Sequence, residues 1–275
     1  MAGRMISCVR RLSVILVAFC SLCFVCCNIT DTSDGEIDLL DGSVQFRIGE
    51  SYSEPTTVED PSLMLFMTTE EIYPCCNYSI ASMLVKDESS IFVELLGVYK
   101  PDICMTAIGP ADSRSKIALA PGNYSLSFSL DNLIDEYFVT VTDSSISVDG
   151  NGSFTATTKP LVWRYPPRTF AYLCGTTTET SWICSEFLDS LLVTGLFEEY
   201  QFPDSGSIPY PESSEGYYYN MPVAYFCYQQ EADFETAGAI LERYAKSTTK
   251  QHTGVGLSLI NWRNKRYHSW LLEEK

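Results

Sequence analysis

Two successive runs of alternating apolar and polar side chains constrain the fold more than any other part of the chain, and they lie in the stretch NYSLSFSLDNLIDEYFVTV. The first run has an apolar side chain at every second position from Tyr124 to Leu130, and the pattern resumes between Tyr137 and Val141. Period-two patterning with aromatic and β-branched residues is typical of half-buried strands. The polar stretch between the runs, residues 131–135, predicts the turn of a β-hairpin.

The same pattern recurs on both sides of this hairpin. Further strands are predicted at residues 42–48 and 62–68, in a hairpin over residues 79–100 that turns at 86–90, and in a late hairpin over residues 144–158 that turns at 149–152. Several short strands separated by polar turns are typical of immunoglobulin-like sandwiches. We therefore predict an all-β, Ig-like sandwich over residues 42–159.

The pattern changes at TKPLVWRYPPR, residues 158–168, where three prolines and two arginines interrupt it, so we place a domain boundary there. Beyond it, strand patterns at TFAYLCG and MPVAYFCYQ alternate with two helical patterns, the first stopped by Gly195 and the second begun by Asp233 as a cap. A closing hairpin is predicted around residues 263–265. This order predicts a two-layer α+β domain over residues 168–275, for which a ferredoxin-like topology is one arrangement.

The N-terminal segment predicts export. Residues 12–25 contain no charged side chain and follow three arginines. A basic start and about 14 apolar residues are typical of a secretory signal, whereas a membrane-spanning helix needs about 20. The segment ends in Cys26 and Cys27 and lacks the small residues that ordinary signal peptidase requires. It is similar to a bacterial lipoprotein signal, with Cys27 as the lipid-bearing residue and Cys26 as the second choice.

This interpretation divides the N-terminal region into a signal peptide, residues 1–27, and an acidic tether, residues 28–41. The predicted location is the cell envelope, where the chain is lipid-anchored at a periplasmic or outer-membrane surface, and secretion is the second choice. The formal net charge is −17, although residues 1–27 contain only basic charges. Such an acidic chain repels nucleic acid and anionic lipid headgroups. The predicted partners are the membrane, through the N-terminal lipid, and a protein or glycan, but no nucleic acid.

Six cysteines remain if Cys27 carries lipid, three in each predicted domain: Cys75, Cys76, Cys104, Cys174, Cys184 and Cys227. An exported chain can oxidise them, although sequence alone does not give the pairing. Cys104 is expected to pair with Cys76 or with its neighbour Cys75. Cys174 and Cys227 lie in strands that are adjacent in a ferredoxin-like sheet, so we expect a contact or a disulfide between them. Cys184 is expected to be a buried thiol.

No group of catalytic residues stands out. Beyond the signal the chain has two histidines, His252 and His268, and it has no Gly-x-Ser-x-Gly elbow and no glycine-rich phosphate loop. Ser113 and Lys116 match a Ser-x-x-Lys spacing, but the companion motifs are missing and a loop is expected there. We therefore predict no enzymatic activity, no cofactor and no metal site. The alternative is an exported hydrolase that acts on glycans or peptides through carboxylates that the sequence does not mark.

Two segments are candidate binding surfaces. Tyr217, Tyr218 and Tyr219 lie in a long loop rich in Pro, Ser and Gly, where they can contact a partner or fold back onto the sheet. Arg263, Lys265 and Arg266 lie beside aromatic residues and suit a carboxylate or glycan, unless they form a solvated hairpin tip.

Three segments of the first predicted domain carry a family resemblance: YPCCNYSI, LGVYKPDICMTAIGPA and APGNYSLSFSLDNLIDEYFVTVTDSSISV. They resemble an uncharacterised family of bacterial envelope lipoproteins with an N-terminal Ig-like β-sandwich module. The resemblance implies a location and a fold, and it implies no catalytic residue because the family has no assigned activity.

These observations together predict an exported, membrane-anchored lipoprotein for non-catalytic binding or assembly at the cell envelope. A further alternative rests on four Asn-x-Ser/Thr acceptors, which begin at Asn28, Asn77, Asn123 and Asn151. They are compatible with a secreted, N-glycosylated eukaryotic or viral protein.

Overall fold

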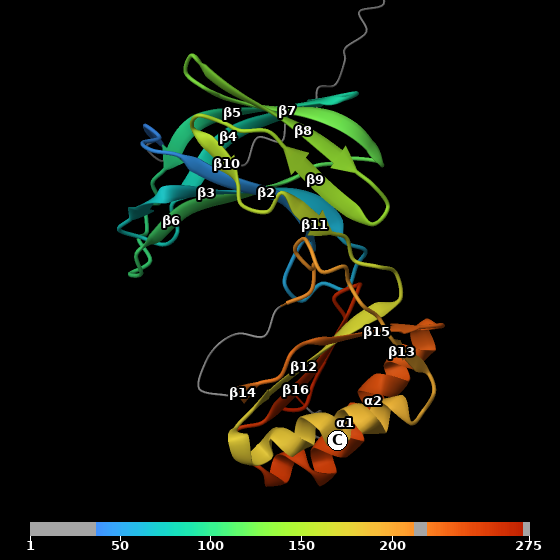
Figure 1. The fold of residues 1–275 in the computed structure, drawn as a ribbon. Helices are drawn as coiled ribbons and strands as arrows, with labels where there is room; N and C mark the ends of the chain where they lie inside the picture. Colours follow the sequence, from blue (N-terminus) through green and yellow to red (C-terminus); the bar gives the residue numbers. More distant parts are fainter. Residues whose placement is uncertain (1–36, 212–218, 272–275) are drawn as a thin grey trace, which may run out of the picture.

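The computed structural model describes residues 37–211 and 219–271, which consist mainly of β-strands in two separate sheets (Figure 1). The first sheet has eleven strands and ends at Trp163, and the second has six strands and begins at Thr169. Within the described ranges, no helix has the length and apolar character needed to cross a membrane. The predicted signal, Cys26 and Cys27 lie outside the described residues.

The strands of the first sheet are β1 (Ile37–Asp38), β2 (Val44–Ser51), β3 (Ser62–Tyr73), β4 (Ser79–Asp87), β5 (Ser90–Tyr99), β6 (Gly109–Lys116), β7 (Gly122–Leu130), β8 (Leu133–Val141), β9 (Ser145–Asp149), β10 (Thr155–Thr157) and β11 (Leu161–Trp163). Their order is β10-β2-β3-β6-β4-β5-β7-β8-β9-β11, and β1 pairs with β5. Figure 1 shows that β2, β3 and β6 form a lower layer and that β5, β7 and β8 form an upper layer.

The first core lies between these two layers. Alternate side chains point inward, as the period-two pattern predicts, and the ring of Phe46 in β2 meets Phe128 in β7 at 4.7 Å and Tyr137 in β8 at 4.8 Å between centroids. Each fully buried Phe or Leu stabilises the fold by about 1.5–3 kcal/mol relative to an exposed one. The described part is therefore β-rich and sandwich-like.

The turn between β7 and β8 is shorter than the sequence predicts. Leu130 pairs with Leu133, so only Asp131 and Asn132 form the turn, and Asp131 has a φ of 51°. Two-residue hairpin turns favour Asp and Asn because these residues tolerate positive φ. The predicted turn at residues 131–135 is wrong in length, and Asp135 belongs to the strand.

Asp135 is a buried carboxylate, 4% exposed, that holds the segment before β10. It accepts hydrogen bonds from the backbone amides of Ser153, Phe154 and Thr155 and from the hydroxyls of Ser153 and Thr155, at 2.7–3.0 Å. Burial alone would raise the pKa of Asp135, but these hydrogen bonds outweigh it and lower the pKa to about 2. The carboxylate therefore supplies the hydrogen-bond acceptors that a neighbouring strand would otherwise give to these backbone amides.

The predicted late hairpin does not form, because β10 leaves β9 and pairs in parallel with β2 on the opposite layer. β9 pairs with β11 instead, so the predicted boundary segment contributes a strand to the first sheet. The predicted tether also ends earlier than expected. Ile37 and Asp38 form β1 opposite Tyr99 and Val98, and Gly97, with a φ of 141°, leaves room for this close approach.

The second sheet consists of β12 (Thr169–Thr176), β13 (Phe197–Glu199), β14 (Tyr219–Asn220), β15 (Ala224–Tyr228), β16 (Gly256–Asn261) and β17 (Arg266–His268). Its order is β13-β15-β12-β16-β17, with antiparallel neighbours, and β14 pairs with β12. Helices α1 (Ser181–Leu192) and α2 (Glu231–Ser247) cover one face, and η1 (Thr178–Thr180) and η2 (Thr249–Gln251) are short 3₁₀ turns (Figure 1).

The helix ends follow the sequence closely. α1 is followed by Gly195 with a φ of 67°, as the stop signal predicts. α2 begins after Gln230, and Asp233 accepts the backbone amide of Gln230 at 2.8 Å. Asp233 thus stabilises the helix start from the third helical position, where the sequence analysis expected it to be the cap itself.

One disulfide is among the expected pairs and the other is not. Cys75 pairs with Cys104, which is one of the two partners expected for Cys104, and Cys76 is a free, exposed thiol. Cys174 pairs with Cys184, which joins β12 to α1, so Cys184 is not a free thiol.

Cys227 is also free, and the expected contact between Cys174 and Cys227 is wrong. Cys227 belongs to β15 and lies opposite Thr169 of β12. Thr169 is at the other end of β12 from Cys174. Its neighbours Phe226 and Tyr228 face the helices, so Cys227 faces away from the core that contains Cys174.

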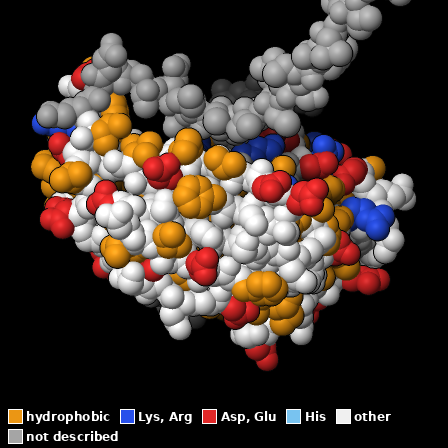
Figure 2. All heavy atoms as spheres, turned by 90° about the horizontal axis from the view of Figure 1, so that it is seen from above, with side chains coloured by type: hydrophobic (Ala, Val, Ile, Leu, Met, Phe, Trp, Pro, Cys, Tyr) orange, Lys and Arg blue, Asp and Glu red, His pale blue; other side chains and the backbone are white. Residues whose placement is uncertain are grey.

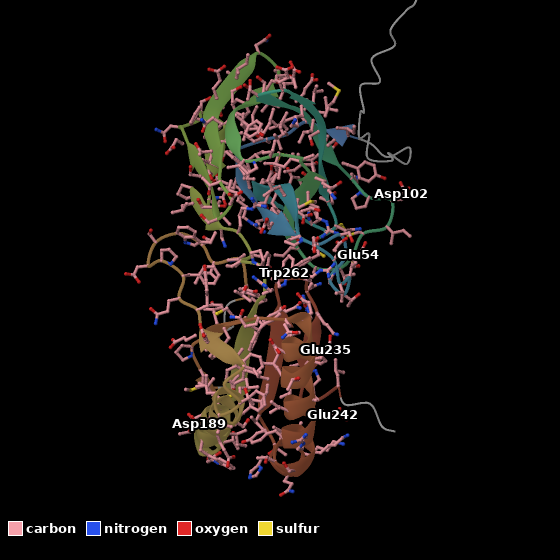
Figure 3. All side chains as sticks on the ribbon, turned by 90° about the vertical axis from the view of Figure 1, so that its right-hand side faces the viewer. Glu54, Asp102, Asp189, Glu235, Glu242 and Trp262 are labelled. Carbon is pink, nitrogen blue, oxygen red and sulfur yellow. A yellow bond between two sulfur atoms is a disulfide. The ribbon has the colours of Figure 1, made fainter. Side chains whose placement is uncertain are left out.

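Contacts between the two sheets come from segments far apart in the sequence. The Tyr52 hydroxyl donates to the carbonyl of Trp262 at 2.9 Å, and the Asn264 amide donates to the carbonyls of Pro55 and Thr57. Figure 3 shows Glu54 and Trp262 on either side of this junction. A further contact joins the last strand of the first sheet to the loop after β13. Here the Trp163 backbone amide donates to the carbonyl of Ser207 at 2.8 Å.

Candidate functional site

Three neighbouring strands of the lower layer carry a row of cationic and aromatic side chains. Arg47 in β2 lies opposite Phe66 in β3, and Phe66 lies opposite Arg114 in β6. These positions alternate with the buried Phe46 and Leu65, so their side chains lie on the outer face of the layer. The guanidinium of Arg47 stacks over the Phe66 ring, with 3.7 Å between its carbon and the ring centroid.

A groove of about 530 Å³ follows this row. Its lining includes the three side chains of the row together with Gln45, Thr68, Cys76, Asp112, Ser113, Thr158 and others. Burial lowers the pKa of Arg47 from its ordinary value, although a guanidinium remains charged at neutral pH. Stacking on Phe66 keeps that charge in a fixed position, where it is attracted to the face of the ring. The groove therefore presents a preorganised cation.

A second hollow of about 450 Å³ continues toward the junction between the sheets, and it shares Arg47 and Phe66 with the groove. Its far side is formed by Lys159, Tyr165 and residues 207–211. The Tyr165 hydroxyl donates to the carbonyl of Pro209 at 2.6 Å, and the ring of Tyr165 meets Tyr210 edge-on at 4.9 Å. Burial raises the pKa of Tyr165, so its hydroxyl stays uncharged at neutral pH.

Three cations line the two hollows: Arg47, Arg114 and Lys159. Among the described residues, no carboxylate lies within ion-pair distance of these three side chains. In contrast, Arg164 pairs with the buried Glu50 at 2.8 Å. In a chain with a net charge of −17, a group of cations without acidic partners is a surface that favours an anion.

Ser113 points away from the cationic row, because it lies opposite the buried Met67 and next to the outward-facing Arg114. The side-chain oxygen of Ser113 is buried and has no hydrogen-bond partner among the residues that the structure describes. The Ser-x-x-Lys sequence lies in strand β6, where a loop was expected, so Ser113 and Lys116 point to opposite sides of the strand. Their spacing therefore forms no nucleophile and base pair.

The predicted basic surface near the C-terminus has partners within the chain. Arg263 forms an ion pair with Asp60 at 2.9 Å, and Lys265 forms one with Glu235, which Figure 3 shows on α2. The guanidinium of Arg266 donates to the side chain of Asn264 at 2.9 Å. These ion pairs tie the closing hairpin to the junction and to α2, and a binding role for Arg263, Lys265 and Arg266 stays a prediction.

The predicted tyrosine surface cannot be placed. Tyr217 and Tyr218 lie outside the described residues, and Tyr219 belongs to β14, where its backbone pairs with Thr176. The structure therefore does not bring the three tyrosines together with Arg263, Lys265 and Arg266 into one described site.

The two histidines are separate from one another and from the groove. The ring of His268 in β17 lies 2.8 Å from the hydroxyl of Ser258, between Nδ1 and Oγ, and it stacks on Trp270. Burial, and then the charge of Arg266, lower the pKa of His268. His252 meets the edge of Trp182. Across the described ranges, no three His, Cys, Asp or Glu side chains are placed to hold a metal ion.

The upper face of the molecule offers a different surface. Figure 2 shows apolar and acidic side chains scattered over this face among uncharged polar ones. Phe92 and Phe138 are exposed here, and Ser125 and Ser127 of β7 lie between their strands.

The sequence contains a signal for the groove that pattern reading missed. In β3, Leu63, Leu65 and Met67 are buried, so Met64 and Phe66 stand at positions where polar side chains are expected. A large apolar side chain at such a position indicates that it contacts a neighbouring side chain on the outer face of the sheet. Its pairing with Arg47 and Arg114 depends on strand order, which the alternating pattern does not give.

Comparison with known proteins adds no further information, since no family model, no curated protein and no solved structure matches this chain.

Proposed function

We propose that this chain is an exported, membrane-anchored protein that binds an acidic segment of a partner protein, without catalysis, in the groove along β2, β3 and β6. The observation that carries the proposal is the row of Arg47, Phe66 and Arg114, in which both cations lack acidic partners within the described residues. Arginine recognises carboxylates through paired hydrogen bonds with a fixed geometry.

The Arg47 guanidinium argues for a peptide ligand over a glycan. Sugar rings bind proteins by stacking on an open aromatic face, and Arg47 covers the Phe66 ring at 3.7 Å. Phe66 therefore serves to position the cation. Carboxylate side chains of a partner suit Arg47 and Arg114 better than a neutral sugar does.

The edge of β6 supports an extended ligand. The amide of Ile117 donates to Leu63 in β3, so the backbone groups of Lys116 and Arg114 point away from β3. β4 pairs with β6 only at Ser79 and Asp112, so within the described residues these groups have no strand partner. An extended acidic peptide can add to such an edge, with its carboxylates next to Arg114.

The export and anchoring part of the proposal is supported by the leader. Three arginines, an uncharged apolar run at residues 12–25 and the cysteine at position 27 fit a lipoprotein signal. The two disulfides fit an oxidising compartment outside the cytosol. We retain Cys27 as the proposed lipid-bearing residue.

We also propose finer fold names for the two sheets. The first is a β-sandwich, and its parallel pairs β2–β10, β4–β6 and β5–β7 depart from the antiparallel sheets of immunoglobulin domains. The second is an α+β layer of ferredoxin-like topology. Support comes from the order β13-β15-β12-β16, with one helix after β12 and another after β15.

The binding proposal is tested by titrating the full chain with a fluorescein-labelled hexaglutamate peptide and following anisotropy. The variants Arg47→Gln and Arg114→Gln should each weaken binding about tenfold or more, equivalent to about 1.4 kcal/mol. Arg243→Gln removes an exposed arginine of α2 and is the matched control. Equal affinity of all three variants for the peptide would refute the groove as the binding site.

A further inference from the structure

Exposed apolar side chains gather at the end of the first sheet opposite the junction. We name this group the apolar tip, and it consists of Ile37, Leu39, Ile72, Ile103, Met105 and Ile108. Leu39 is 87% exposed, Ile103 80% and Ile108 77%. Exposed apolar groups of this size on one end of a soluble domain mark an interaction surface.

Strand pairing and side-chain bonds bring these residues to the same end. β1 pairs with the end of β5, immediately before the loop of residues 100–108. Ile72 lies opposite Pro110, close to the end of that loop. In Figure 3 Asp102 marks the loop, which projects from the side of the first sheet, and Figure 1 shows the ends of β3 and β6 on the same side.

The loop of residues 100–108 is tied in place, so its apolar side chains have no alternative buried position nearby. The disulfide between Cys75 and Cys104 anchors its middle. The side-chain amide of Asn77 donates to the carbonyl of Ile103 at 2.8 Å and accepts the amide of Met105 at 3.1 Å. The fold thus holds Ile103 and Met105 outward on both sides of a covalent link.

The chain outside the described residues ends at this tip. The apolar run of residues 12–25 is separated from Ile37 by eleven positions. Eleven or twelve residues span at most about 40 Å when fully extended, at about 3.3–3.6 Å each. If the leader or a lipid on Cys27 lies in a membrane, the apolar tip therefore stays within a short distance of that membrane.

We infer that the apolar tip docks on the lipid surface that holds the N-terminal anchor, with a neutral, zwitterionic headgroup layer as its partner. This inference rests on the membrane anchoring in the proposed function. The charges of the tip select the lipid class, because Asp38, Asp41, Glu71 and Asp102 are exposed or near-exposed acids with only Lys100 among them. Acidic side chains repel an anionic layer and tolerate a neutral one.

The pKa of Tyr73 is raised in part by these acids, which lie close to the tip. Burial, followed by the charge of Glu71 and the more distant charges of Asp41 and Asp38, raises the pKa of Tyr73 to about 12. Tyr73 itself stacks on Tyr78 at 4.9 Å and packs against the first core. The tip is therefore an apolar surface on a rigid aromatic base with an acidic margin.

The experiment places a tryptophan in the tip of the full chain. Ile103→Trp is reconstituted into phosphatidylcholine vesicles that contain brominated acyl chains, and the added emission is compared with Val193→Trp. Val193 is 84% exposed, follows α1 in the second part of the molecule and is the matched control. We expect the emission of Ile103→Trp to shift to shorter wavelength and its quenching to exceed that of the control at least twofold.

Each outcome decides between named alternatives. Flotation with the vesicles but equal quenching of both variants would overturn the docking and leave the anchoring intact. A chain that does not float with the vesicles would overturn both. A wavelength shift that depends on protein concentration, without quenching, would replace the lipid surface with a second copy of the chain. Stronger quenching in vesicles rich in anionic lipid would contradict the assigned headgroup class. None of these results depends on the peptide titration of the groove.

Discussion

The buried carboxylate of Asp135 offers the sharpest test of how the first sheet is held together. Asp135→Asn removes its charge and turns an NH₂ group toward amides and hydroxyls that are themselves donors, at 2.7–3.0 Å. Because buried donors are then left without acceptors, we expect the free energy of unfolding at pH 7 to fall by about 3 kcal/mol. Asp149→Asn, an exposed acid at the end of β9, is the control and should change it by less than about 0.5 kcal/mol.

The dependence on pH separates the charge of Asp135 from its shape. Its pKa falls from 3.8 to about 2 on folding, which corresponds to about 2.5 kcal/mol of stability. Because the folded pKa is the lower one, this contribution is complete above about pH 5 and is lost as the pH falls toward 2. About half of it should be lost at pH 3 in the natural chain, whereas Asp135→Asn has no such loss.

The assay is urea unfolding followed by far-ultraviolet circular dichroism at pH 7, 5, 4 and 3. The difference between the natural chain and Asp135→Asn should narrow steadily below pH 5, while Asp149→Asn should follow the natural chain throughout. Parallel curves for the natural chain and Asp135→Asn from pH 7 to pH 3 would show that the carboxylate charge contributes nothing. The proposed role of the five hydrogen bonds would then be refuted.

Arg164→Met leaves the carboxylate of Glu50, whose side chain is 3% exposed, without its ion-pair partner. Thermal unfolding should therefore show that the free energy of unfolding falls by about 3 kcal/mol, and an unchanged melting temperature would contradict this. Gly238→Ala should destabilise the chain by about 1–3 kcal/mol, because the added Cβ would lie 2.5 Å from the Tyr267 ring. This cost should exceed the gain from the better helix propensity of Ala, and a stabilised variant would show that the ring can move. Cys76 should react with iodoacetamide in the unreduced protein, and peptide mapping that finds it in a disulfide would overturn the assigned pairing.

The sequence predicts much of the fold because burial leaves a periodic mark. The alternation at Tyr137 and Val141 correctly indicates inward-facing positions, and extended backward by two residues it also places Asp135 inside. The polar character of Asp135 obscured this, because a carboxylate is expected in a turn. Its five hydrogen-bond donors come from residues 153–155, which no local pattern connects to it.

Pairings across the chain could not be predicted for the same reason. The apolar Phe66 on the outer face of β3 is visible in the sequence, but its neighbours Arg47 and Arg114 follow from a strand order in which β6 lies beside β3. The cysteines show the same limit. Cys174 and Cys184 are ten positions apart, and only the packing of α1 on β12 brings them together.

The junction has a consequence for how the chain reaches its final form during synthesis. The Tyr52 hydroxyl and the Trp262 carbonyl that it contacts are 210 positions apart, and Asn264 contacts Pro55 and Thr57 across a similar distance. The loop before β3 therefore emerges from the ribosome long before its partners do. We therefore expect proteases to cut this loop more readily in a nascent chain that stops short of Trp262 than in the full chain.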